Sequence, residues 1–166
     1  MSGFKSAELR QASSVKYTAP RPARPTGVLH FTISVTDLER SRRFYEEIVG
    51  CTFWRRNETT VFMRCGESYF VLSRSGYHTA PNRGRDTLIH YAFIIEPQHF
   101  DAAAAHLEAN GIEVLLYEDT GHQSFPGRHL YFHDPDGNAI EFVDLQTHSS
   151  ETNANGRARR PRSHLS

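Results

Sequence analysis

The feature that most constrains the fold is one order of predicted elements that occurs twice along the chain. Residues 29–37, LHFTISVTD, alternate apolar and polar side chains as a half-buried strand does. Residues 38–50, LERSRRFYEEIVG, carry an apolar stripe at helical spacing and end at a glycine. Three short strand-like segments follow, and the same order begins again at residue 88. The chain is therefore predicted to fold as two tandem βαβββ modules in the α+β class.

The second module repeats the signals of the first. Residues 88–96, LIHYAFIIE, predict a strand, and residues 97–111 predict a helix with Pro97 near its start and Gly111 at its end. Three more strands are predicted within residues 112–145. This repetition makes the polar positions of corresponding strands comparable between the two modules.

Domain boundaries follow from where apolar residues stop. One domain is expected over residues 27–146, with modules at about 27–76 and 87–146. The segments 1–26 and 147–166 contain too few apolar residues to build a core, and both are expected to be disordered tails. The second tail contains the basic run RARRPR, which favours a solubilising role over a specific contact.

Composition excludes several function classes. The chain has 166 residues, 38% of them hydrophobic and 23% charged, as in a soluble globular protein. The chain has 19 basic residues (Lys and Arg) and 19 acidic residues (Asp and Glu). It therefore has no net charge that would attract nucleic acid or a membrane surface. Cys51 and Cys65 are too few for a disulfide framework, and no apolar run is long enough to span a bilayer. We therefore expect a cytoplasmic protein without a nucleic-acid or membrane partner.

Three metal-ligating side chains occupy the polar faces of otherwise apolar strands. His30 and His90 lie at matching places in the first strand of each module, and Glu141 stands between Ile140 and Phe142 in the last strand. A carboxylate in such a run is costly to bury unless it lies at a wet edge or binds a cation. Two histidines and one carboxylate form the facial triad that binds divalent iron with open positions. The pattern therefore predicts a shared metal site.

At these residues the chain resembles the vicinal oxygen chelate superfamily, which contains glyoxalases, bleomycin-resistance proteins, fosfomycin-resistance transferases and type I extradiol dioxygenases. The resemblance covers about residues 28–145 and rests on LHFTISVTDLERSRRFYEEIVG, IHYAFII and YFHDPDGNAIEF. It implies that the two modules form a U-shaped mixed sheet around one metal. It also implies the ligands His30, His90 and Glu141, and a homodimer whose modules pair within or between chains.

Within this superfamily, the extradiol branch has a signature that the chain matches in spacing. The matching residues are Thr120, His122, Leu130, Tyr131, Asp134, Pro135, Gly137 and Glu141. The resemblance implies that His122 and Tyr131 line the substrate pocket and that His78 is a candidate acid–base residue. It favours an Fe(II)-dependent dioxygenase that cleaves a catechol-type aromatic substrate with O2, although the same triad takes Mn, Ni, Co or Zn.

Tyr131 carries a geometric test of this interpretation. A five-residue loop from Asp134 to Asn138 pairs Tyr131 with Glu141 on the metal face, whereas a four-residue loop turns it to the helix side. Trp54 is a further candidate, because its ring could stack on a flat ligand.

Three other branches are alternatives. A fosfomycin-type thiol transferase is supported by Thr32, which such proteins use near the metal. It is disfavoured because TGHQSFPG and FVDLQTHSS contain no Lys or Arg to clamp a phosphonate, and Arg128 could serve only in an altered geometry. A metal-free drug-binding protein is disfavoured because the triad is intact. Glyoxalase chemistry is disfavoured because the fourth ligand would have to be Glu67, in a turn.

Overall fold

The computed structural model describes residues 27–83, 88–119 and 125–145. The expected tails, together with Thr120 and His122 of the extradiol signature, lie outside the described residues. Within the described part of the chain, the structure contains no helix long and apolar enough to cross a membrane.

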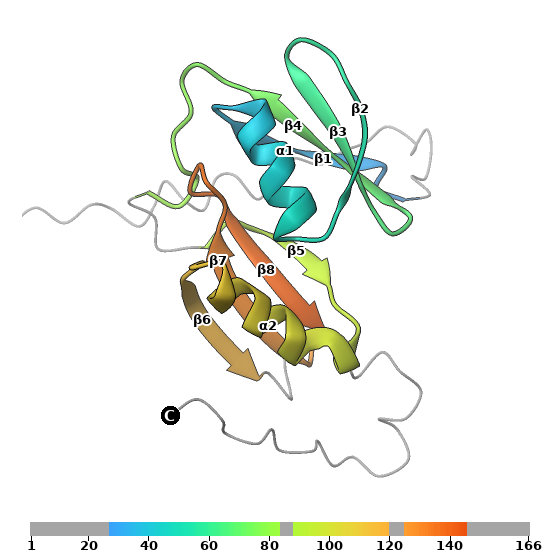
Figure 1. The fold of residues 1–166 in the computed structure, drawn as a ribbon, viewed down its shortest axis with the longest axis vertical. Helices are drawn as coiled ribbons and strands as arrows, with labels where there is room; N and C mark the ends of the chain where they lie inside the picture. The colour runs from blue at the N-terminus through green and yellow to red at the C-terminus, as the bar shows by residue number, and fades with distance from the viewer. Residues whose placement is uncertain (1–26, 84–87, 120–124, 146–166) are drawn as a thin grey trace, which may run out of the picture.

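Each module forms one four-stranded mixed sheet with one main helix (Figure 1). The first module contains β1 (His30–Val35), α1 (Leu38–Glu47), β2 (Thr52–Arg56), β3 (Thr60–Cys65) and β4 (Ser68–Arg74). The second contains β5 (His90–Ile94), η2 (Pro97–His99), α2 (Phe100–Ala109), β6 (Val114–Asp119), β7 (Arg128–His133) and β8 (Ala139–Asp144). The sheet orders β1-β4-β3-β2 and β5-β8-β7-β6 correspond strand for strand. The predicted α+β fold of tandem βαβββ modules is confirmed.

The first helix begins where its sequence provides a cap. The Asp37 carboxylate accepts hydrogen bonds from the backbone N–H groups of Glu39 and Arg40, which have no partner within the helix. The apolar stripe of α1 then turns Phe44 and Tyr45 inward, and Tyr45 is completely buried. The stripe therefore fixes α1 against the sheet of its own module, as Figure 1 shows.

One hydrophobic core joins the two modules. Phe31 of β1 stacks on Phe70 of β4, with ring centroids 5.5 Å apart, and on Tyr91 of β5, with centroids 5.2 Å apart. Phe70 in turn meets Phe93 of β5 edge-on at 5.5 Å. These side chains all belong to the apolar faces of their strands, so the two sheets share a core through these faces. Because side chains alternate along a strand, His30 and Glu141 occupy the opposite faces of their sheets.

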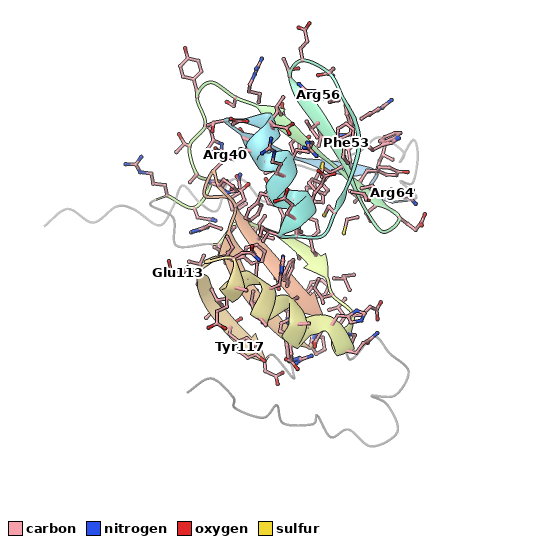
Figure 2. The ribbon with its side chains drawn as sticks, viewed as in Figure 1. Arg40, Phe53, Arg56, Arg64, Glu113 and Tyr117 are labelled. Atoms are coloured by element: carbon pink, nitrogen blue, oxygen red, sulfur yellow. The ribbon has the colours of Figure 1, made fainter. Side chains whose placement is uncertain are left out.

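A polar junction also ties the β7–β8 turn to the first module. The Tyr45 hydroxyl donates to Asp134 Oδ2 at 2.9 Å, and Arg40 Nη2 donates to Asp136 Oδ1 at 2.6 Å. Asn138 Nδ2 donates to the backbone oxygen of Ser34 at 3.0 Å. Figure 2 shows Arg40 on α1 at the side of the module where this turn reaches it. The relative placement of the two modules is therefore held by hydrogen bonds as well as by apolar contact.

Candidate metal site

Glu141 is a buried carboxylate surrounded by hydrogen-bonding groups. It is 4% exposed, and β8 runs between β5 and β7 in the second sheet. His90 Nε2 lies 2.8 Å from Oε2, the Tyr131 hydroxyl donates to Oε1 at 3.0 Å, and His129 Nδ1 contacts Oε1. A carboxylate can be buried only when partners of this kind replace water. Glu141 is thus neither at a wet edge nor an isolated buried charge.

His90 presents one ring nitrogen to Glu141 and anchors the other. Its Nδ1 lies 3.0 Å from the backbone oxygen of Leu88, an acceptor, so Nδ1 carries the proton of the neutral ring. Nε2 then has a lone pair that faces a carboxylate oxygen. A proton or a metal ion between Nε2 and the carboxylate oxygen would bind to both atoms. Anchoring of the distal nitrogen to a carbonyl is also the usual arrangement of a histidine that ligates metal. The donor pair therefore fits a divalent cation.

Tyr131 lies where the five-residue loop predicts. The β7–β8 register pairs it directly with Glu141, so both side chains lie on the same face of the second sheet. Burial raises the pKa of the Tyr131 phenol, and the charge of Glu141 and the hydrogen bond to it raise the pKa further. Tyr131 therefore keeps its proton at neutral pH and acts as a hydrogen-bond donor.

His129 belongs to the same group, although it is not among the site residues predicted from the sequence. It is 6% exposed and lies two residues before Tyr131, so the alternation of β7 places it on the same face. That alternation could have identified it, because a histidine two residues from a residue on the metal face shares that face.

The predicted triad does not come together within one chain. His30 and Thr32 lie on the polar face of β1 and are exposed. Among the described residues, which include all three predicted ligands, no three His, Cys, Asp or Glu side chains form a group that could hold a metal. The shared core explains this, because the two sheets meet through their apolar faces and their polar faces lie on opposite sides of it.

The face that carries His30 is lined by aromatic and basic side chains. Register places Thr32, Val71, Phe62 and Arg55 in one row across β1, β4, β3 and β2. The β2 irregularity at Trp54 brings its ring 5.0 Å from that of Tyr69. The Arg55 guanidinium lies over the rings of Trp54 and Phe62, at 4.2 and 4.6 Å from their centroids. Trp54 is 50% exposed, so this face can meet a ligand.

Arg64 lies on the same face, opposite Tyr69 in the β3–β4 register. Figure 2 shows Arg64 on the first sheet, away from the second module.

The remaining predicted residues have other surroundings. The half-buried His78 is held at the module junction, where Nδ1 lies 3.1 Å from Ser34 Oγ and Nε2 lies 2.8 Å from the backbone oxygen of Asp136. Arg128 lies on the α2 side of β7, where Nε donates to Asp144 Oδ2 and Nη1 donates to Asp101 Oδ1. The Glu67 side chain is 97% exposed, as expected for a turn residue.

Comparison with known proteins identifies the family. The pattern of the Glyoxalase/Bleomycin resistance protein/Dioxygenase superfamily matches residues 27–142, and the chain belongs to this family. A glutathione transferase FosA from Serratia marcescens is 31% identical over 114 residues, which cover 68% of this chain and 76% of that protein. A metallothiol transferase FosB from Staphylococcus epidermidis is 28% identical over 116 residues, covering 70% and 80%.

Solved structures agree on the fold. A variant of the fosfomycin resistance protein FosX from Listeria monocytogenes, complexed with Mn(II) and 1S,2S-dihydroxypropylphosphonic acid, superposes with a TM-score of 0.60 at 20% identity, covering 73% of this chain and 93% of that one. A lactoylglutathione lyase from Agrobacterium tumefaciens superposes with a TM-score of 0.58 at 22% identity, covering 74% and 96%.

These relatives correct the predicted chemistry. The expected iron-dependent ring-cleaving dioxygenase, with an aromatic substrate and O2, is wrong, because the similar proteins are thiol transferases and fosfomycin resistance proteins. The second half of the extradiol signature is common to the superfamily, and His122 lies outside the described residues. The segments next to Tyr131 and Glu141 in the sequence lack a basic clamp for a phosphonate, but Arg55 and Arg64 lie on the other sheet and are distant in sequence. The relatives support a divalent metal as cofactor.

Proposed function

We propose that this protein is a metal-dependent thiol transferase that adds a small thiol to a small anionic electrophile. The observation that carries the proposal is the convergence of His90 Nε2 and the buried Glu141 Oε2, 2.8 Å apart, on one face of the second sheet. The 31% identity to a glutathione transferase supports the thiol as co-substrate.

We place the third ligand, His30, on a second copy of the chain. His30 is exposed on the polar face of the first sheet, and Glu141 lies on the corresponding face of the second. A two-fold dimer that sets the first sheet of one copy against the second sheet of the other brings the three ligands together twice. Apolar side chains exposed on these two faces support such a contact; they are Trp54 on the first sheet and Ile94 and Leu116 on the second.

The metal would be held by His30 of one copy and by His90 and Glu141 of the other, leaving positions open for substrate. Such an ion supplies Lewis-acid polarisation of a substrate oxygen. Fe(II), Mn(II), Ni(II), Co(II) and Zn(II) all suit two imidazoles and a carboxylate. Mn(II) is the first ion to test, because the FosX structure contains it. Tyr131 holds the carboxylate from the side away from His90, since it donates to the other oxygen.

Arg55 and Arg64 would provide the positive charge that an anionic substrate needs. Both lie on the face that carries His30 and Thr32, and Arg55 is held in place by the Trp54 and Phe62 rings. A phosphonate prefers planar guanidinium donors of this kind. For an epoxide substrate, the S–C bond forms as the ring C–O bond breaks, and the thiol proton ends on the released oxygen.

A thiol-consumption assay tests this function. Purified protein is mixed with Mn(II), fosfomycin and either glutathione or cysteine, and free thiol is followed with a colorimetric disulfide. We expect consumption that requires both metal and protein and that is lost in Glu141→Gln. Metal-loaded protein that consumes neither thiol above the metal-only blank would contradict the proposal. Conversion of a glutathione hemithioacetal instead would assign the lyase branch.

A further inference from the structure

His129 makes a contact that none of the assigned roles explains. The side chain is 7% exposed in the middle of the second sheet, yet imidazole is a polar group whose burial requires partners. Its Nδ1 contacts Glu141 Oε1, and its Nε2 lies 2.8 Å from the backbone oxygen of Phe125, in the segment before β7. The ring is therefore held between a carboxylate and a backbone carbonyl.

These contacts divide the two oxygens of Glu141. Oε1 contacts His129 Nδ1 and accepts a hydrogen bond from the Tyr131 hydroxyl, whereas Oε2 faces His90 Nε2. A carboxylate with one oxygen held by two side chains cannot rotate freely about its final torsion. Oε2 is thereby left in a fixed direction, facing His90 Nε2.

We propose that His129 is a positioning residue that orients Glu141 Oε2 toward the metal while it is itself anchored by the Phe125 carbonyl. The inference rests on the proposed function, because it requires Glu141 to be a ligand. Groups that hydrogen-bond a metal ligand typically change metal affinity about 10- to 100-fold when they are removed.

The two nitrogens of His129 can be tested separately. In His129→Asn, the amide nitrogen can occupy the place of Nδ1 and still donate to Glu141. In His129→Gln, the amide nitrogen can occupy the place of Nε2 and donate to Phe125 but not to Glu141. His129→Leu removes both contacts. His133→Asn is a matched control, because His133 is an exposed histidine on the same strand.

The experiment is a titration of the full-length metal-free proteins with Mn(II), in which free Mn(II) is read by electron paramagnetic resonance and thermal unfolding is recorded in parallel. We expect His129→Gln and His129→Leu to bind Mn(II) about 10-fold or more weakly than wild type, and His129→Asn and His133→Asn to stay within about threefold. The Gln variant carries the test if the Leu variant does not fold.

Equal affinity of the Gln variant and wild type would overturn the inference. The inference would also be overturned if the Asn and Gln variants lost Mn(II) affinity equally and in proportion to their loss of thermal stability. That result would show that His129 has only a structural role. Failure of the proposed function has different signatures: wild-type protein would bind no Mn(II) if the metal site is absent, or would bind Mn(II) without consuming thiol if only the transferase chemistry is absent.

Discussion

Tyr131 and Glu141 face one another across the β7–β8 ladder, and the phenol donates to Glu141 Oε1 at 3.0 Å. Both side chains are buried, so removal of the hydroxyl leaves a charged oxygen with one donor fewer. We expect Tyr131→Phe to lower the free energy of unfolding of the metal-free protein by about 1–3 kcal/mol. Urea denaturation measures the change.

Tyr77→Phe is the matched control for this variant, because Tyr77 is 98% exposed and its substitution should change stability little. Equal stabilities for Tyr131→Phe and Tyr77→Phe would contradict the placement of the Tyr131 hydroxyl.

Gly127 lies against the backbone of the last strand. A Cβ atom built at this position falls 1.9 Å from the backbone oxygen of Asp144, and the residue has φ +155°. We expect Gly127→Ala to destabilise the protein by more than a typical surface substitution, by about 2 kcal/mol or more. Gly76→Ala, where a Cβ meets nothing within 4 Å, should remain near wild type in the same denaturation series. Equal stability of the two variants would refute the close approach.

The two cysteines share one hydrogen bond and differ in acidity. Cys51 donates to Cys65, which lowers the pKa of the Cys65 thiol to about 7, whereas the same contact and burial raise the pKa of Cys51. The thiolate is the reactive form, so alkylation of Cys65 by iodoacetamide should increase as pH rises through about 7. Cys51, which is buried, should react slowly in the folded protein.

Cys51→Ala tests the cause of this acidity. Without the donated hydrogen bond, the midpoint of Cys65 alkylation should move up toward the ordinary thiol pKa of about 8.5. A midpoint that is the same with and without Cys51 would show that another group sets the acidity.

Much of the fold could be predicted because alternation and helical spacing are local. The same alternation put His90 and Glu141 on one face, and the length of the Asp134–Asn138 loop predicted the register of Tyr131. The same rule places His129 on the face that carries Tyr131 and Glu141.

The packing of the two modules could not be predicted in this way. Alternation indicates which face of a strand is apolar, but not whether the apolar faces of two sheets meet each other. The contact of Phe31 with Tyr91 decides this, and it separates His30 from Glu141 within one chain. The transferase chemistry could not be predicted for a related reason. Basic residues such as Arg55 and Arg64 can lie near a site in space without lying near it in the sequence.

Loss of single ligands should abolish metal binding. His30→Ala and Glu141→Ala each remove one of the three proposed donors, and both should lose stoichiometric Mn(II) in equilibrium dialysis. His106→Ala is the control, because His106 is an exposed helix residue that contacts the backbone oxygen of Glu47. Wild-type metal content in His30→Ala would remove His30 from the site.

Mixing these two inactive variants tests the two-copy site most directly. His30→Ala and Glu141→Ala are combined in equal amounts, unfolded and refolded together, and Mn(II)-dependent thiol transfer is measured. Half of the dimers then contain both variants, and each of these has one intact site, so the account predicts about a quarter of wild-type activity. Activity no higher than that of the separate variants, with mixed dimers shown to be present, would contradict a site built from two copies.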